Sequence, residues 1–316
     1  MIDGYGRKIN YLRVSVTKRC NLNCSYCGCE SEKDAELSRD EILKLVSAFS
    51  RLGITKVRLT GGEPLVRSDI CEIAGGIAKT EGIKKLALTT NGVLLAKYAK
   101  RLKQAGVNAV NISLDTTDKR QYEQITGFDL LDKVYEGIDE AERVGLSPIR
   151  LNAVLIRGQN DNQAEKLISI ARDRKIDVRF IELMPFSDEG DNEKLVIKGE
   201  EILAAFPYLK EINEAGKGNF ERSVARYYSA EGFKGRVGFI TPVSDKFCGE
   251  CNRIRLLSDG KVKPCLGSEK VFDLKPFLDN EEVLLKKAEE AIFAKPMEHQ
   301  FSCGYGHSHG LNRIGG

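Results

Sequence analysis

The chain lacks features that mark several classes of protein. No apolar run reaches the roughly 18 residues that a membrane-spanning helix needs, and the opening segment, MIDGYGRKIN, contains no apolar stretch of the kind found in signal peptides. A G-x4-G-K-[ST] segment is also absent, which excludes a P-loop. We therefore expect a cytoplasmic protein that has neither a membrane segment nor a P-loop.

A large excess of charge is missing as well. The net charge is only +3 over 316 residues, which does not indicate nucleic-acid binding. Apolar residues make up 41% of the chain and charged residues 30%, as in ordinary soluble proteins. A chain of this length and composition can form one large α/β domain and a smaller module.

Short apolar runs alternate with amphipathic runs of helical period from residue 11 to residue 183. We expect strands at 11–16, 55–60, 84–89, 108–113, 149–155 and 177–183. We expect helices from 38 to about 53, and at about 68–80, 93–105, 131–144 and 161–174. Such alternation with short connections favours a parallel sheet. Six units are too few for a closed eightfold barrel, so the sequence predicts an α/β fold, a partial (β/α)6 open TIM-like barrel.

The pattern changes in the last third of the chain. Residues 199–206 are typical of a helix, and short strands are expected at 224–229, 236–241 and 252–257. We place the barrel domain at 1–213 and a C-terminal domain at 214–316. This second domain carries its own cysteines, and we expect it to be an iron–sulfur extension that covers the barrel opening.

Three of the nine cysteines, Cys20, Cys24 and Cys27, lie within eight residues and have the spacing C-x3-C-x2-C. Structural zinc takes four ligands, whereas three thiolates suit a [4Fe-4S] cluster with one iron left open for a small-molecule chelate. Cys29 is a candidate fourth ligand, but a single residue separates it from Cys27. We favour the cluster over zinc.

A second triplet, Cys248, Cys251 and Cys265, has the spacing C-x2-C-x13-C. It again favours a cluster with an open iron. A zinc site closed by His299, His307 or His309 remains an alternative. Cys29, Cys71 and Cys303 belong to neither triplet.

Basic residues recur at strand positions predicted to face the barrel interior. They are Arg13, Lys56, Arg58, Arg150 and Arg179, and Arg253 and Arg255 share a face just after the second triplet. Several cations facing one lumen are costly without an anionic partner, and arginine suits forked recognition of phosphate. The pattern therefore predicts a pocket for a polyphosphate. A Gly-Gly-Glu-Pro loop at 61–64 follows a strand and can approach a ligand closely.

The cysteine loop and the Gly-Gly-Glu-Pro loop together resemble the radical S-adenosylmethionine superfamily. Within it, nearly the whole chain resembles the GTP 3′,8-cyclase (MoaA) family of molybdenum cofactor biosynthesis. The segments that carry the resemblance are LRVSVTKRCNLNCSYC (12–27), VRLTGGEPLVR (57–67), LTTNG (88–92), NISLD (111–115), RFIELM (179–184), CGECNRIRLLSDGKVKPCL (248–266) and the terminal IGG (314–316).

The resemblance implies two [4Fe-4S] clusters, one on each cysteine triplet, and S-adenosyl-L-methionine as cofactor. Cofactor contacts are implied for Tyr26, Gly62, Glu63, Ser113, Arg179 and Met184. Contacts with GTP are implied for Arg13, Lys56, Arg58, Thr89, Arg150, Arg253, Ile254 and Arg255. Catalytic roles are implied for Arg13 and for the terminal Gly315 and Gly316, which in the family reach into the active site.

The implied activity is the radical conversion of GTP to 3′,8-cyclo-7,8-dihydroguanosine 5′-triphosphate, a lyase reaction that opens molybdenum cofactor biosynthesis. It implies an electron donor and a downstream cyclic pyranopterin monophosphate synthase as partners, with the chain a monomer or homodimer. The chain departs from the family at Gly28 and Cys29, which replace Met-Pro, at Arg150, where lysine is common, and in the short segment HSHGLNR (307–313).

Two other functions compete with this interpretation. A radical enzyme that modifies peptides would share the cysteine loop, but the inward cations fit a triphosphate better. A non-catalytic electron carrier would need fully ligated irons and would have no use for the Gly-Gly-Glu-Pro loop.

Overall fold

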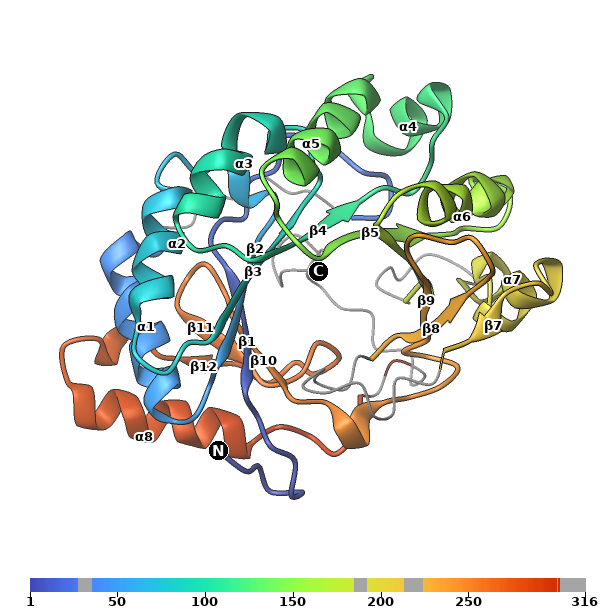
Figure 1. Cartoon of the computed structure of the whole chain (residues 1–316). Coiled ribbons are helices and arrows are strands. Elements are labelled where there is room, and N and C mark those ends of the chain that lie inside the picture. The colour runs from blue at the N-terminus through green and yellow to red at the C-terminus, as the bar shows by residue number, and fades with distance from the viewer. Residues whose placement is uncertain (28–35, 185–191, 213–223, 300, 302–316) are drawn as a thin grey trace.

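A curved sheet with eight parallel strands at its centre forms the protein (Figure 1). The structure, a computed structural model, describes residues 1–27, 36–184, 192–212, 224–299 and 301. The parallel strands follow the order β10-β1-β2-β3-β4-β5-β6-β9. Their bounds are Tyr11–Ser15 for β1, Lys56–Thr60 for β2, Lys85–Thr90 for β3, Ala109–Ser113 for β4, Ile149–Val154 for β5, Asp177–Ile181 for β6, Val237–Ile240 for β9 and Arg253–Leu256 for β10.

The curved sheet forms a ring, and helices cover its outer face (Figure 1). The inner face of the sheet points toward the centre of the ring. The helices are α1 (Arg39–Arg51), α2 (Ile70–Lys79), α3 (Leu95–Gln104), α5 (Leu131–Arg143) and α6 (Ala164–Asp173), with α7 (Gly199–Ala205) beyond β6. Each of the six predicted strands and five predicted barrel helices is present, within a few residues of the expected ends. The predicted parallel sheet is therefore confirmed.

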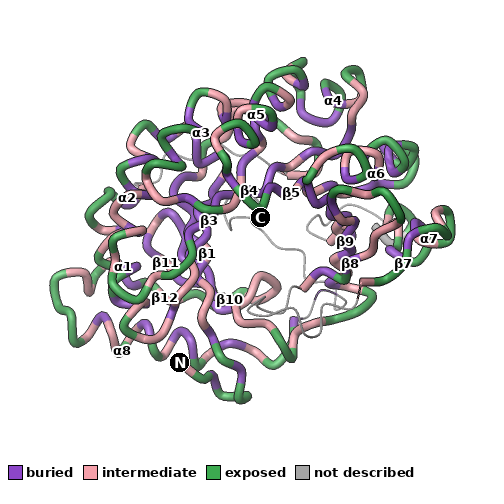
Figure 2. The backbone as a smooth tube through the Cα atoms, viewed as in Figure 1, coloured by how far each residue is buried: buried purple, intermediate pink, exposed green. Residues whose placement is uncertain are grey.

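Period-two alternation along the strands separates a dry face from a polar one. On the helix-facing side Leu12, Val57, Leu88 and Val110 are fully buried in one continuous core. Figure 2 shows buried positions along the central strands of the sheet. The alternate positions on the same strands carry the polar and basic residues. The core thus fixes the register that presents those side chains to the interior.

The C-terminal part of the chain extends the sheet at both of its edges. Strand β9 pairs with β6, and β10 pairs with β1 on the far side of the ring. Two antiparallel strands continue each edge: β11 (Lys261–Lys263) and β12 (Phe272–Asp273) beside β10, and β8 (Arg226–Ser229) and β7 (Lys210–Glu211) beside β9. The domain boundary that we placed after residue 213 falls outside the described residues and stays a prediction.

Two helices were not expected from the sequence. Helix α4 (Lys119–Thr126) begins after Asp118, whose side chain accepts a hydrogen bond from the Gln121 amide, and it ends at Gly127 in the left-handed region (φ 81°). Helix α8 (Glu281–Phe293) is capped by Asn280 and packs against α1. No helix among the described residues is long and apolar enough to cross a membrane.

Candidate active site

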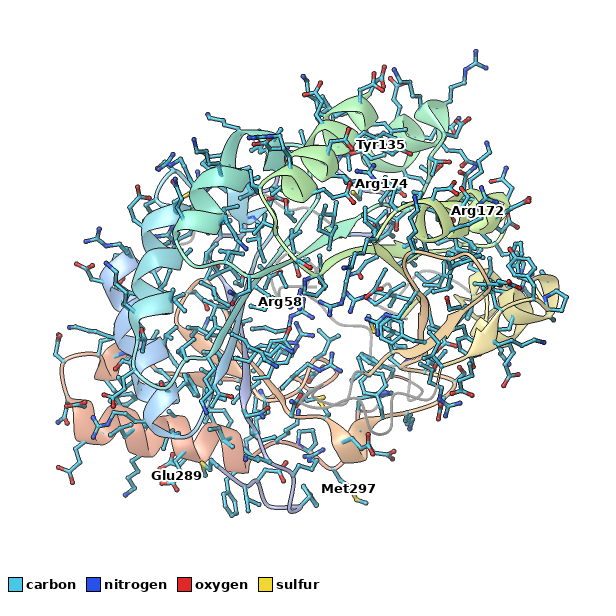
Figure 3. The ribbon with its side chains drawn as sticks, in the orientation of Figure 1. Arg58, Tyr135, Arg172, Arg174, Glu289 and Met297 are labelled. Carbon is cyan, nitrogen blue, oxygen red and sulfur yellow. The ribbon has the colours of Figure 1, made fainter. Side chains whose placement is uncertain are left out.

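Two rows of mostly cationic side chains cross the inner face of the sheet, because parallel pairing places equivalent positions side by side. From β10 through β1 to β2, the rows of Cα partners are Arg255–Arg13–Arg58 and Arg253–Tyr11–Lys56. In Figure 3 the labelled Arg58 lies inside the ring of strands. The sequence-predicted basic residues of these three strands are therefore brought together.

Tyr11 lies at the centre of this group and was not predicted as a site residue. Its hydroxyl accepts a hydrogen bond from Arg58 Nε, and Lys56 Nζ lies 4.5 Å from the centroid of its ring. Burial raises the pKa of Tyr11, but the charges of Arg58, Arg13, Lys56 and Arg253 outweigh burial and bring the pKa down to about 7. These four cations therefore favour the ionised form of the phenol.

The arginines themselves are crowded. Burial and the neighbouring Arg255 hold the pKa of Arg13 well below its usual value. Burial also lowers the pKa of Arg255 and of Arg179 to about 10. Nη2 of Arg253 is buried with no hydrogen-bond partner among the described residues. Such a concentration of buried positive charge is stable only with an anion nearby, as the polyphosphate prediction requires.

On the opposite wall of the ring, Arg179 and Arg150 each have a partner on a neighbouring strand. Arg179 donates from Nε and Nη2 to Asn152 Oδ1 at 3.0 and 2.7 Å. Nε of Arg150 lies 3.7 Å from a carboxylate oxygen of Asp177, which also binds Arg236 at 2.7 Å. The charge at Arg150 is therefore partly compensated by Asp177.

Two predicted substrate contacts differ in where the structure places them. Thr89 lies on the inner face of β3, where its hydroxyl is 3.3 Å from Arg58 Nη1. The side chain of Ile254, between the two arginines of β10, is fully buried on the helix-facing side beside Leu12. Strand alternation turns this side chain away from the lumen, and the predicted contact of Ile254 with substrate stays a prediction.

The Gly-Gly-Glu-Pro loop packs tightly against the segment that leads into the first cysteine triplet. The Gly62 amide donates to Thr17 O, and the Glu63 amide donates to Arg19 O, both at 2.8 Å. A Cβ on Gly62 would lie only 2.4 Å from Arg19 O and 2.6 Å from Lys18 O. Glycine is needed here because the two backbones touch.

The Glu63 side chain organises this loop. It is fully buried, and its carboxylate accepts hydrogen bonds from the Leu65 amide (3.0 Å), the Thr90 hydroxyl (2.7 Å) and the Asn91 amide (2.7 Å). Burial raises its pKa to about 7 although these three bonds favour the carboxylate. The structure thus shows Glu63 bracing the ends of β2 and β3. Its predicted contact with the cofactor stays a prediction.

Asn91 connects this brace to the cysteine loop. Its Nδ2 donates to Asn21 Oδ1 at 2.8 Å and lies 3.9 Å from Cys20 Sγ. Tyr26 is held by a 2.5 Å hydrogen bond from its hydroxyl to Asp115 Oδ2. Burial and the negative charge of Asp115 raise the pKa of Tyr26 well above its usual value, so it remains a neutral donor. The ends of β3 and β4 therefore hold the cysteine loop.

The chemistry of both cysteine triplets fits iron–sulfur clusters. All six cysteines are partly exposed thiols, and the structure shows no disulfide between described cysteines. No three His, Cys, Asp or Glu side chains of the described residues converge on a point where one metal ion could sit. Three thiolates are the ligand set of a [4Fe-4S] cluster with one open iron, whereas structural zinc takes four ligands.

Cations surround the C-terminal triplet. Burial raises the pKa of Cys251, but Arg253 and Lys295 outweigh burial and bring it down to about 7. His299, a candidate zinc ligand, is buried with Nε2 2.7 Å from Pro242 O and its ring 4.3 Å from that of Phe301. Its contacts are those of a packing residue.

The remaining predicted residues lie at the site, in the core or outside the described part of the chain. Ser113 ends β4 on the inner face, and Met184 follows β6; both are partly exposed. Cys71 is buried in α2 and belongs to the hydrophobic core. Gly315, Gly316, Cys29, Cys303, His307 and His309 lie outside the described residues. Tyr11, Asn91 and Asp115 were missed, although Asn91 and Asp115 lie in the LTTNG and NISLD segments that carry the resemblance.

Comparison with known proteins shows which family the chain belongs to. Residues 14–171 match the radical SAM superfamily, and residues 176–301 match the family described as Molybdenum Cofactor Synthesis C. A GTP 3′,8-cyclase of Alkaliphilus oremlandii is 44% identical over the full length of both chains. The chain belongs to the GTP 3′,8-cyclase family. Relatives of the same name in Clostridium acetobutylicum (43% identical, 96% of this chain and 95% of the relative) and Listeria monocytogenes (40%, 95% and 92%) agree.

Solved structures show that this member of the GTP 3′,8-cyclase family has the radical SAM fold. Streptococcus suis SuiB bound to S-adenosylmethionine aligns with a TM-score of 0.63 at 16% identity, covering 92% of this chain and 67% of that one. Native anSMEcpe with bound AdoMet aligns with a TM-score of 0.59 at 19% identity, covering 90% of this chain and 83% of that one. At this identity the likeness concerns the fold alone, and the predicted partial TIM-like barrel is confirmed.

Proposed function

We propose that this chain is a radical S-adenosylmethionine enzyme that converts GTP to 3′,8-cyclo-7,8-dihydroguanosine 5′-triphosphate, the first step of molybdenum cofactor biosynthesis. Membership of the GTP 3′,8-cyclase family supports the activity. One observation supports GTP as the substrate. On β10, β1 and β2, two rows of inward residues place Arg253, Arg13 and Arg58 around Tyr11.

Cys20, Cys24 and Cys27 would hold a [4Fe-4S] cluster whose open iron binds S-adenosyl-L-methionine. When bound, this pair supplies a radical able to remove hydrogen from an unactivated carbon. The protein would surround the cluster and its cofactor with the loop at 61–64 and the ends of β3 and β4. Tyr26, Gly62, Ser113 and Met184 are the proposed contacts with this cofactor, together with Glu63 and Arg179.

The cationic rows would bind the triphosphate and thereby orient the ribose toward the first cysteine loop. Forked arginine pairs suit this task because they fix both position and direction of a phosphate. Holding the reacting carbon close to the radical, in a lumen that excludes water, is the protein's main contribution to rate. Gly315 and Gly316 are proposed to reach this lumen, as in the family.

We further propose a second [4Fe-4S] cluster on Cys248, Cys251 and Cys265, with an open iron that meets the guanine. The chain would take its electrons from a reduced donor and pass its product to a cyclic pyranopterin monophosphate synthase. It would work in the cytoplasm as a monomer or homodimer.

A direct test uses chemically reduced, reconstituted protein under anaerobic conditions. The account predicts that formation of 5′-deoxyadenosine from S-adenosyl-L-methionine rises strongly with GTP and far less with guanosine. The rival peptide-modifying function predicts no response to GTP. SuiB has been solved with its precursor peptide, so a peptide of that kind is the matched alternative substrate. Stimulation by the peptide and not by GTP would overturn the proposal.

A further inference from the structure

A buried arginine of the N-terminal segment reaches the second cysteine triplet. Arg7 is 8% exposed and is fixed by Asp3, whose Oδ2 lies 2.6 Å from Arg7 Nε. The two Nη atoms of Arg7 donate to backbone carbonyls. Nη1 lies 2.9 Å from Cys248 O, and further bonds of 3.4, 2.7 and 2.9 Å reach the carbonyls of residues 295, 296 and 297. One side chain thus joins the first cysteine of the triplet to the segment after α8.

A buried lysine in that segment continues the connection. Lys295 is 3% exposed, and its Nζ donates to Arg253 O at 2.8 Å and to Pro264 O at 3.0 Å. Arg253 stands two residues after Cys251, and Pro264 immediately precedes Cys265. Lys295 therefore holds together the chain segments that carry the second and third thiols.

The two cations differ in how their charge is balanced. Arg7 has its own carboxylate in Asp3, so its contribution is geometric. Among the described residues no carboxylate lies within ion-pair distance of Lys295. A buried ammonium without a carboxylate is costly, and thiolates that carry a cluster would offset this cost. Both positive charges would be favourable beside the three thiolates once these hold a cluster, because the thiolates are anionic.

We propose that Arg7 and Lys295 are positioning residues that hold the three thiols of Cys248, Cys251 and Cys265 in the arrangement that accepts the second cluster. This rests on the proposed second cluster. Neither residue is among those proposed to contact substrate or S-adenosyl-L-methionine. Their removal is expected to affect one cluster and to spare the other.

The test compares the metal content of full-length variants after anaerobic reconstitution. The variants are Lys295→Met and the double change Asp3→Asn with Arg7→Met, which avoids leaving Asp3 as an unpaired buried charge. Lys8→Met, next to Arg7, and Lys286→Met, in α8, change exposed lysines and serve as controls. We expect about eight irons in the wild-type chain and the controls, and about four in the two variants.

Two further readouts separate a positioning role from a general loss of folding. Slow cleavage of S-adenosyl-L-methionine without GTP requires only the first cluster and should remain in both variants. In a background with Cys20, Cys24 and Cys27 all changed to alanine, the electron paramagnetic resonance signal of the reduced second cluster should disappear on Lys295→Met and partly return with Lys295→Arg. Eight irons and an unchanged signal in both variants would overturn the inference alone. A wild-type chain with only four irons would overturn it together with the second cluster.

Discussion

At the scale of single residues, the decisive feature is positive charge gathered around one phenol. Arg13, Arg58 and Arg253 approach Tyr11 because in-register positions on three parallel strands face the same lumen. Their combined charge lowers the pKa of Tyr11 to about 7 against the effect of burial. An anionic ligand would take over the role of the phenolate, so ionisation of Tyr11 and binding of phosphate should oppose each other.

Tyr11 is therefore expected to make GTP affinity fall as pH rises above 7. A bound triphosphate raises the pKa of Tyr11, and binding to the ionised protein must first return a proton to the phenol. Between pH 7 and pH 8 the affinity of the wild-type chain should fall about fivefold relative to Tyr11→Phe, which has no proton to lose. Equilibrium binding at several pH values measures this. Superimposable pH profiles for the two proteins would show that Tyr11 does not ionise there.

Removal of Arg58 should weaken binding of the phosphates specifically. Arg58→Ala loses a charge-assisted hydrogen bond worth about 1.5–3 kcal/mol, or roughly ten- to a hundredfold in GTP affinity. Guanosine should lose much less, because it has no phosphate to contact. Arg101→Ala, on the exposed side of α3, is the matched control and should leave both affinities unchanged. Equal losses for GTP and guanosine would show that Arg58 does not contact phosphate.

At the scale of elements, the loop after β2 and the cysteine loop behave as one unit. Backbone hydrogen bonds from Gly62 and Glu63 reach Thr17 and Arg19, and the Glu63 carboxylate ties the same loop to Asn91. The position of the first cysteine triplet is thus set by strands on both sides of it. A small displacement of one loop should therefore displace the other.

Gly62→Ala should disturb the first cluster. The new Cβ would meet backbone oxygens of Arg19 and Lys18 at 2.4 and 2.6 Å, and neither can rotate away. Cleavage of S-adenosyl-L-methionine should fall at least tenfold. Gly75→Ala in α2 is the matched control: its Cβ would meet only Ala105 Cβ at 4.0 Å, and alanine should stabilise the helix by about 0.5–1 kcal/mol. Normal cleavage by the Gly62 variant would contradict the tight packing of the two loops.

The elements also show what the sequence could reveal. The strands of the barrel were predictable because apolar residues alternate with polar ones in short runs. Helix α8 could have been found from its Asn280 cap and its acidic first turn. Pairing of β10 with β1 could not, because it joins residues more than two hundred positions apart and no local pattern encodes it.

At the scale of the whole molecule, the C-terminal region extends the open barrel at both edges of its sheet. Without β9 and β10, strands β6 and β1 would have exposed edges, and Ile254 and Leu256 would leave the common core. The cationic field was predictable as a set of inward arginines. The sequence did not reveal which arginines have partners within the chain. Arg150 pairs with Asp177 and Arg179 with Asn152, and each partner lies on a neighbouring strand.

The whole chain should accordingly unfold as one cooperative unit. Calorimetry of the full chain without clusters is expected to show a single transition, because the two sequence regions share one sheet and one core. A chain cut after residue 212 should show no cooperative transition and should aggregate through the exposed strand edges. Cooperative unfolding of the shortened chain near the temperature of the full one would show that the first 212 residues form an independent domain.

The central claim is that this site directs a radical to the ribose of GTP. The most direct measurement uses GTP carrying deuterium at C3′, with reduced, reconstituted protein and S-adenosyl-L-methionine. Mass spectrometry of the products should find one deuterium in 5′-deoxyadenosine and a cyclised nucleotide that still carries three phosphates. Deuterium that stays entirely in the nucleotide while 5′-deoxyadenosine accumulates would contradict the account.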